Sequence, residues 1–128
     1  MARIKYTVDY LIKSSPTILF DFLSTASGLS QWFADRVEDN NADELVFFWE
    51  GYPEKAAIVD AVDNEFIRFE MESGEDEEYL EFRIEKSEVT ADTILIITDF
   101  ADKTDIPDQK KLWDSQIKTL TNRVGGSN

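Results

Sequence analysis

The fold is decided at residues 105–124, which have the sequence DIPDQKKLWDSQIKTLTNRV. Asp105 and Pro107 are typical of a helix start, and Gly125 is typical of a helix stop. At ~1.5 Å per residue a helix from Pro107 to Val124 is about 27 Å long, which is enough to cross a whole sheet. It carries one apolar stripe, formed by Trp113, Ile117, Leu120 and Val124. We therefore expect one long helix that covers the core.

Strand patterns fill most of the chain before this helix. In residues 4–12, apolar side chains occupy every second position, which is typical of a half-buried strand. Similar patterns, separated by turn-forming residues and by a polar break at Asp39–Asp43, predict further strands at residues 36–38, 45–49, 55–62, 66–72, 80–85 and 93–100. The short connections favour hairpins, so the expected sheet is antiparallel.

Two short helices are expected after the first strand. Ser15 can cap the first helix, with Pro16 as its first residue. Ser27 is the expected cap of the second, which carries Leu29, Trp32 and Phe33 at helical spacing.

The strands at 66–72 and 80–85 are expected to form a hairpin around the acidic segment 72–78. One register places three apolar pairs on its core face, Ile67 with Ile84, Phe69 with Phe82 and Met71 with Leu80. The same register places Arg68 diagonally across from Glu81 on the outer face.

The composition excludes several classes of chemistry and partner. The chain has 128 residues with no His and no Cys, so it has no Ser-His-Asp triad, thiolate nucleophile, disulfide or thiolate zinc site. Its 27 Asp and Glu against 13 Lys and Arg give a net charge of −14, whereas nucleic acids and anionic membranes attract clustered Lys and Arg. No apolar run approaches the ~20 residues of a membrane span. We therefore expect a soluble, cytoplasmic protein with no nucleic-acid partner and no membrane insertion.

The charge is unevenly distributed. Residues 103–123 hold five basic and three acidic residues, a local charge of +2, which leaves −16 for the rest of the chain. Lys110, Lys111 and Lys118 on the polar face of the long helix are candidate residues for binding a protein partner. Alternatively, this basic helix complements the acidic sheet and its own C-terminal dipole.

Particular segments also support a resemblance that covers nearly the whole chain. They are Ser15-Pro16 before the first short helix, LSQWFA at 29–34, WEG at 49–51, AAIVDAVDN at 56–64 and Trp113 in the last helix. With the order of elements, they resemble the START-like (SRPBCC, helix-grip) superfamily, which includes birch-pollen allergens, polyketide cyclases and Aha-type co-chaperone activators, and are nearest to the Aha-type branch. The resemblance implies an α+β fold, in which a curved antiparallel sheet of about six to seven strands wraps around the long C-terminal helix. It also implies one START-like domain over residues 1–128 and a space between sheet and helix that often holds an apolar ligand.

The inward-facing aromatic residues are expected to converge between the sheet and the last helix. There they either line an apolar pocket or fill the core without binding anything. Tyr6 and Tyr10 share one face of the first strand and are the expected hydroxyl donors to a ligand. The candidate ligand-binding residues are Tyr6, Tyr10, Trp32, Phe33, Phe47, Trp49, Phe69, Phe82, Trp113 and Ile117.

The acidic residues are expected to be ordinary surface groups. The runs 35–44 and 72–78 lack the D-x-D-x-D-G spacing of a calcium site, so we expect no metal and no cofactor. Glu50 and Asp99 lie next to expected strand ends and could act as acid or base if buried, but no partner at a defined spacing supports this. No catalytic residue is therefore assigned.

Three functions remain in competition. Non-enzymatic binding of a small apolar or lipid-like molecule follows from the resemblance and the aromatic residues. The alternative is a protein-interaction module that acts through its surface. A cyclase-like or hydratase-like enzyme has the least support, because the chain has no His to transfer protons near neutral pH.

Overall fold

The computed structural model describes residues 3–75 and 77–124, so the expected helix stop at Gly125 lies outside the described residues. The elements are β1 (Arg3–Ile12), α1 (Pro16–Ser24), α2 (Ala26–Leu29), β2 (Arg36–Asn41), β3 (Glu44–Trp49), β4 (Tyr52–Val62), β5 (Phe66–Met71), β6 (Leu80–Lys86), β7 (Thr93–Asp102), the 3₁₀ helix η1 (Lys103–Asp105) and α3 (Ile106–Arg123).

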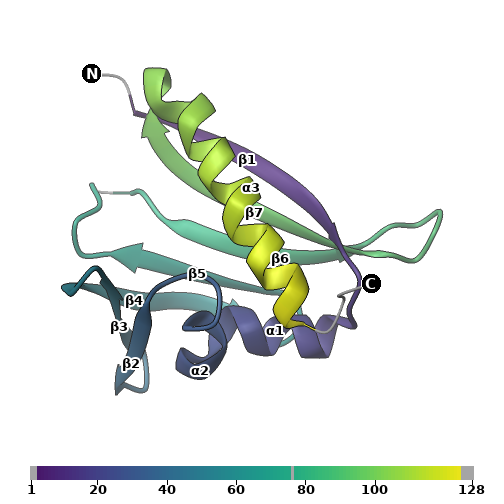
Figure 1. Ribbon diagram of the computed structural model, residues 1–128, viewed down its shortest axis with the longest axis horizontal. Coiled ribbons are helices and arrows are strands. Elements are labelled where there is room, and N and C mark those ends of the chain that lie inside the picture. The colour runs from purple at the N-terminus through teal and green to yellow at the C-terminus, as the bar shows by residue number, and fades with distance from the viewer. Residues whose placement is uncertain (1–2, 76, 125–128) are drawn as a thin grey trace.

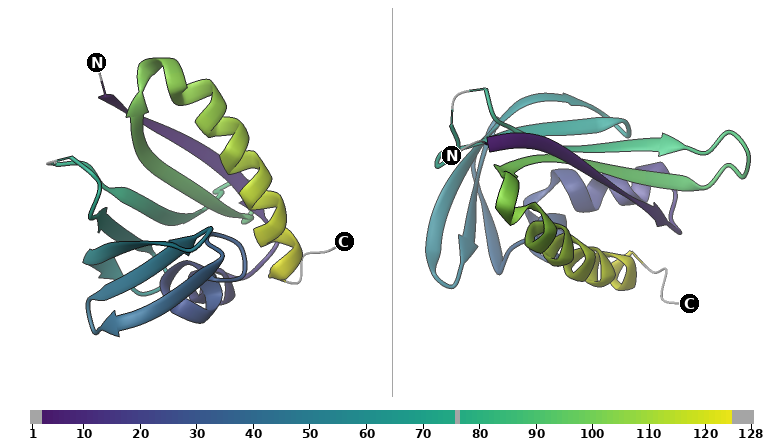
Figure 2. Two further views of the ribbon diagram at one scale, coloured as in Figure 1. Left: turned by 60° about the vertical axis from the view of Figure 1, so that its left-hand side comes forward. Right: turned by 90° about the horizontal axis from the view of Figure 1, so that it is seen from above.

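The described strands form one seven-stranded antiparallel sheet in the order β1-β7-β6-β5-β4-β3-β2. The sheet is curved, and α3 crosses its concave side diagonally (Figure 1). The two short helices lie on the same side of the sheet as α3 (Figure 2). The expected α+β fold, with two short helices after the first strand and a long helix held by a curved sheet, is confirmed.

Side-chain caps start α1 and α2, but the cap of α2 differs from the expected one and α3 starts without a side-chain capping bond. The Ser15 hydroxyl accepts a hydrogen bond from the Ile18 N–H at 3.2 Å, and Pro16 opens α1 as expected. The cap of α2 is Thr25, not Ser27, because Thr25 is extended and its hydroxyl accepts from the Gly28 N–H at 2.9 Å. Asp105 precedes α3 but makes no side-chain capping bond, since its backbone is already helical. The strand β2 likewise continues through the expected polar break to Asn41.

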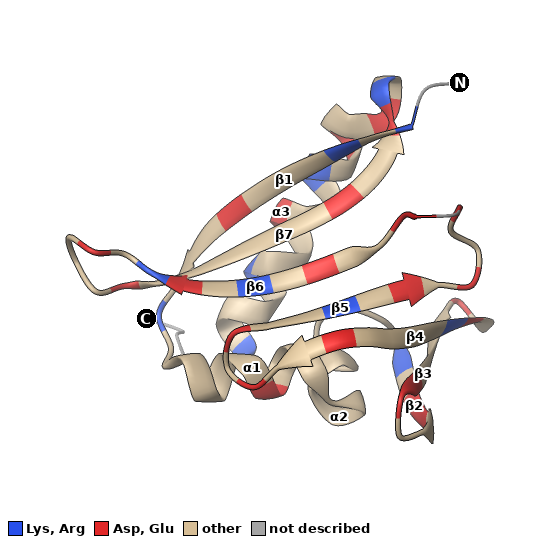
Figure 3. Cartoon of the chain, turned by 180° about the vertical axis from the view of Figure 1, so that it is seen from behind, with Lys and Arg blue, Asp and Glu red and all other residues tan. Residues whose placement is uncertain are grey.

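The β5–β6 register differs from the expected one by two residues. Phe69 lies opposite Leu80 and Arg68 lies directly opposite Glu81. The expected register would have placed Arg68 opposite Arg83, and like charges directly across a sheet are destabilising. In the observed register, the Arg68 Nη2 to Glu81 Oε1 distance is 2.7 Å and the Arg83 Nε to Glu81 Oε2 distance is 3.0 Å. Seen from behind, β5 and β6 both carry acidic and basic positions (Figure 3).

The core lies between the concave face of the sheet and the helices. On α3 the buried residues are Trp113, Ile117 and Leu120, three of the four residues of the expected stripe, and Val124 is half-buried. They pack with buried residues of every strand and of α1 and α2. Among residues 3–75 and 77–124, no helix combines the length and apolar character that a membrane crossing requires.

Candidate functional site

The aromatic residues form a packed cluster centred on Phe33. Its ring lies 5.1–5.9 Å, centroid to centroid, from the rings of Trp32, Phe47, Trp49, Phe82 and Trp113. Phe47, Phe69 and Phe82 are fully buried. The cluster therefore fills the interior, and it leaves space for a ligand at its edge.

A half-open cleft of about 510 Å³ lies at that edge, between α3 and one end of the sheet. Its apolar lining consists of Phe33, Trp49, Met71, Leu80, Leu112 and Trp113. Its polar lining consists of Glu54, Ser73, Asp99, Gln109 and Gln116. The cleft therefore combines a wall of aromatic and aliphatic groups with a few polar side chains.

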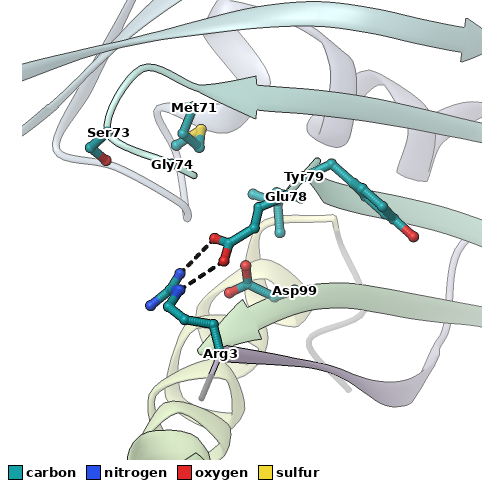
Figure 4. A pocket seen from close by; sticks show the side chains of 8 residues that line it. Arg3, Met71, Ser73, Gly74, Glu78, Tyr79 and Asp99 are labelled. Atoms are coloured by element: carbon teal, nitrogen blue, oxygen red, sulfur yellow. Dashed lines mark hydrogen bonds and ion pairs between the residues drawn. The ribbon is translucent and has the colours of Figure 1, made fainter. Parts of the chain in front are cut away.

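A smaller hollow of about 130 Å³ adjoins the cleft and is shown in Figure 4. The two share Met71, Ser73, Leu80 and Asp99, so Asp99 lies where they meet. Arg3 and Glu78 border the hollow and are joined by two hydrogen bonds, from Arg3 Nε at 2.8 Å and from Arg3 Nη2 at 2.7 Å. This ion pair connects β1 to the β5–β6 loop.

Asp99 ends a chain of hydrogen bonds that begins in α3. The Trp113 indole Nε1–H donates to the Tyr6 hydroxyl at 3.0 Å, and the Tyr6 hydroxyl donates to Asp99 Oδ2 at 3.4 Å. Tyr6 and Asp99 are directly opposite each other in the β1–β7 register. We call this the Trp113–Tyr6–Asp99 chain. It links the helix and two strands at the floor of the cleft.

Burial changes the acidity of both titratable groups in this chain. Burial raises the pKa of the Asp99 carboxyl, and hydrogen bonds from the Phe100 backbone and from Tyr6 only partly oppose it. Burial and the charge of Asp99 raise the pKa of Tyr6 to about 12, so its hydroxyl stays protonated at neutral pH. The arrangement can therefore present a carboxylate, backed by a hydrogen-bond donor, to a molecule in the cleft.

Three residues that line the cleft, Phe33, Trp49 and Gln116, are joined by hydrogen bonds to one backbone carbonyl. The Phe33 carbonyl oxygen accepts from Trp49 Nε1 at 3.1 Å and from Gln116 Nε2 at 3.0 Å. These bonds join the segment after α2 to β3 and α3. Phe33, Trp49 and Gln116 are thus fixed relative to one another.

Comparison with known proteins places this architecture in a family. A family model of the START-like superfamily domain matches residues 1–126. The chain belongs to the START-like superfamily. A search of curated proteins found no match.

Solved structures with the same START-like fold come from several bacteria. A Bacteroides fragilis protein solved by NMR is 35% identical, with 96% of this chain and 92% of that chain covered and a TM-score of 0.68. The Aha1 dimer from Colwellia psychrerythraea is 18% identical, with 97% and 96% covered and a TM-score of 0.73. A Mesorhizobium loti protein is 12% identical, with 98% and 99% covered and a TM-score of 0.77. The last two share the fold with this START-like chain.

The structure separates the residues predicted to bind a ligand in this START-like domain into three groups. Phe33, Trp49 and Trp113 line the cleft. Tyr10 lies outside it, and its hydroxyl donates to Asp114 Oδ1 at 2.7 Å. The remaining predicted residues are buried in the core and do not line the cleft, namely Tyr6, Trp32, Phe47, Phe69, Phe82 and Ile117.

The expectation that Asp99 is a surface carboxylate is wrong, whereas Glu50 is exposed as expected. β7 continues to Asp102, two residues beyond the expected end at Phe100, so Asp99 lies farther from the end of the strand than expected. A sequence signal was present, because Asp99 continues the inward-facing alternation of Leu95 and Ile97.

The predicted partner-binding residues lie together on the outer surface. Lys110, Lys111 and Lys118 of α3 are exposed. Leu112 is 53% exposed on the same helix and reaches the edge of the cleft. In residues 3–75 and 77–124, no three acidic side chains gather as a metal site would require.

Proposed function

We propose that this START-like chain, acting as one domain over residues 1–128, binds a small and largely apolar molecule between α3 and the sheet without catalysing a reaction on it. The observation that carries the proposal is the cleft of about 510 Å³, lined by Trp49, Trp113 and Phe33. Small-molecule sites typically have volumes of about 300–1,000 Å³ and mostly apolar walls with a few polar groups.

Binding of a neutral solvatochromic dye such as Nile red tests this proposal. Leu112→Trp places a large side chain at the mouth of the cleft, and Ser115→Trp is its matched control, because Ser115 is exposed on α3 and does not line the cleft. We expect saturable binding at one site, at least tenfold weaker in Leu112→Trp and unchanged in Ser115→Trp. Equal binding by both variants, or no saturable binding, would contradict the proposal. Native mass spectrometry of gently purified protein would then identify a retained ligand.

A second candidate function is protein interaction through the outer face of α3. It is favoured by the exposure of Lys110, Lys111 and Lys118 on α3. An electrostatically steered partner should be lost as salt increases. We expect its capture to be abolished by Lys→Glu changes at the three lysines and unaffected by a ligand in the cleft. Capture that survives all three changes would exclude this surface.

A further inference from the structure

The charges that face the cleft and its adjoining hollow are mostly acidic. Of the described residues that line the two spaces, Glu54, Glu78 and Asp99 are acidic and Arg3 is basic. The Arg3 guanidinium is already bound through two nitrogens to Glu78. A negatively charged ligand would therefore enter a space of its own charge sign.

Asp99 and Glu54 are the two carboxylates that line the cleft, and Asp99 also lines the adjoining hollow. Glu54 Oε2 accepts hydrogen bonds from both the backbone N–H, at 3.0 Å, and the hydroxyl of Ser73. Asp99 receives one long hydrogen bond, from the Tyr6 hydroxyl at 3.4 Å. Within the described ranges, no Lys or Arg nitrogen lies within 4.0 Å of it. Its carboxylate points toward the Arg3–Glu78 pair across the hollow (Figure 4).

The charge of Arg3 lowers the pKa of Asp99, but Arg3 is hydrogen-bonded to Glu78, so Asp99 remains a partly buried carboxylate that a cationic ligand would stabilise further. Burial penalises the charged form, and an opposite charge within a few ångströms restores it. Charge-assisted hydrogen bonds from an ammonium group are roughly twice as strong as neutral ones. The faces of Trp49 and Trp113 in the same cleft also attract cations.

We propose that the ligand of this cleft is an amphipathic amine, whose protonated nitrogen binds Asp99 while its apolar body lies against Trp49, Trp113 and Leu112. This inference rests on the proposed ligand-binding function and adds the chemical class of the ligand. The Trp113–Tyr6–Asp99 chain holds the carboxylate in place, with Tyr6 as a positioning residue. Fatty acids and other anionic amphiphiles are disfavoured by the same charges.

Three probes that differ only in their polar group test the proposal. They are 1-naphthylmethylamine, 1-naphthalenemethanol and 1-naphthoate, which are cationic, neutral and anionic at pH 7. Their dissociation constants are measured by calorimetry, with the indole N–H signals of the three tryptophans followed by NMR. We expect the amine to bind about tenfold more tightly than the alcohol, and the acid to bind more weakly than both.

Asp99→Asn identifies the group responsible, and Glu85→Gln is the matched control. Glu85 is exposed on the convex side of β6 and lines neither space, so its substitution removes the same charge elsewhere. We expect Asp99→Asn to abolish the preference for the amine while the alcohol affinity changes less than twofold. Glu85→Gln should keep the preference.

The possible failures are distinguishable. If the alcohol and amine bind equally in the unmodified protein, the ligand-class inference is overturned and the binding function stands. If the amine preference survives in Asp99→Asn, the general acidity of the protein explains it, and the role of Asp99 is overturned. If no probe binds and Nile red does not bind either, both proposals fail.

Discussion

Replacing Tyr6 with Phe should destabilise the protein more than the same replacement at Tyr10. Both tyrosines lie on β1 and point to the same side of the sheet. Each donates its hydroxyl proton to a carboxylate, Tyr6 to Asp99 and Tyr10 to Asp114. Tyr6 alone also accepts a bond, from the indole N–H of Trp113, which is 5% exposed.

The expected magnitude follows from what each substitution leaves behind. Tyr6→Phe leaves the buried Trp113 N–H without a partner, and an unsatisfied buried donor destabilises by about 1–3 kcal/mol. The lost bond to Asp99 adds little, since it is 3.4 Å long. Tyr10→Phe leaves an exposed Asp114 that water can solvate, so about 0.5–1 kcal/mol is expected. The free energies of unfolding of the two variants should therefore differ by about 1 kcal/mol.

Urea unfolding followed by tryptophan fluorescence measures this difference. We expect a larger decrease in the midpoint for Tyr6→Phe, at an unchanged slope. The pKa of Asp99, followed by NMR of its carboxyl carbon, should also rise in Tyr6→Phe, because the Tyr6 hydrogen bond lowers it. If Tyr6→Phe is as stable as Tyr10→Phe, the Trp113–Tyr6–Asp99 chain does not contribute as argued.

Three further substitutions test the packing and the charges. Gly28→Ala should destabilise the protein by about 3 kcal/mol, because the new Cβ would lie 2.3 Å from the Asp21 carbonyl oxygen. Thermal unfolding of this variant, compared with that of the control Ser27→Ala, would measure the loss of stability. Hydrogen bonds from Arg68 and Arg83 hold the pKa of Glu81 below its usual value, although burial acts in the opposite direction. The Glu81 carboxylate therefore stabilises the fold above its unfolded pKa, and this stabilisation is lost as pH falls through the folded pKa. Glu81→Gln should therefore destabilise by about 1–2 kcal/mol at neutral pH and by less in acid, and unfolding curves that differ equally at both pH values would contradict this. Burial raises the pKa of Asp99, so the stability that its protonated form contributes is present below the unfolded pKa and is lost as pH rises through the folded pKa. Asp99→Asn should therefore have a larger free energy of unfolding than the unmodified protein at pH 7. Chemical unfolding across this pH range checks the sign, because the difference between the two proteins should disappear in acid.

The fold was predictable because its signals are local and repeated. Alternation along each strand and the stripe on α3 specify which faces are buried, and Ser15 with Pro16 specifies where α1 begins. The β5–β6 register was not predictable from the apolar pattern, because a shift by two residues leaves every side chain on the same face. The charges decided it, through the direct pairing of Arg68 with Glu81.

The candidate site was predictable only in part. The aromatic pattern identified Trp49, Phe33 and Trp113, but the same pattern describes residues that fill the core, such as Phe47 and Phe82. Whether an aromatic ring lies at the rim or in the interior depends on how α3 is placed over the sheet, which no local signal specifies. The burial of Asp99 was not predicted, because its surroundings depend on Tyr6, which is 93 residues away in the chain.

That separation has a consequence for how the protein is made. Among the described strands, each one from β2 to β7 pairs with a neighbour in the chain, whereas β1 pairs only with β7. Contacts between distant segments form late, because the entropy of closing a long loop has to be overcome first. During synthesis β1 leaves the ribosome first, yet we expect it to remain unpaired until β7 and α3 are complete. We therefore expect the cleft and its carboxylate to form in the final step of folding, so that a nascent chain does not yet have the proposed ligand site.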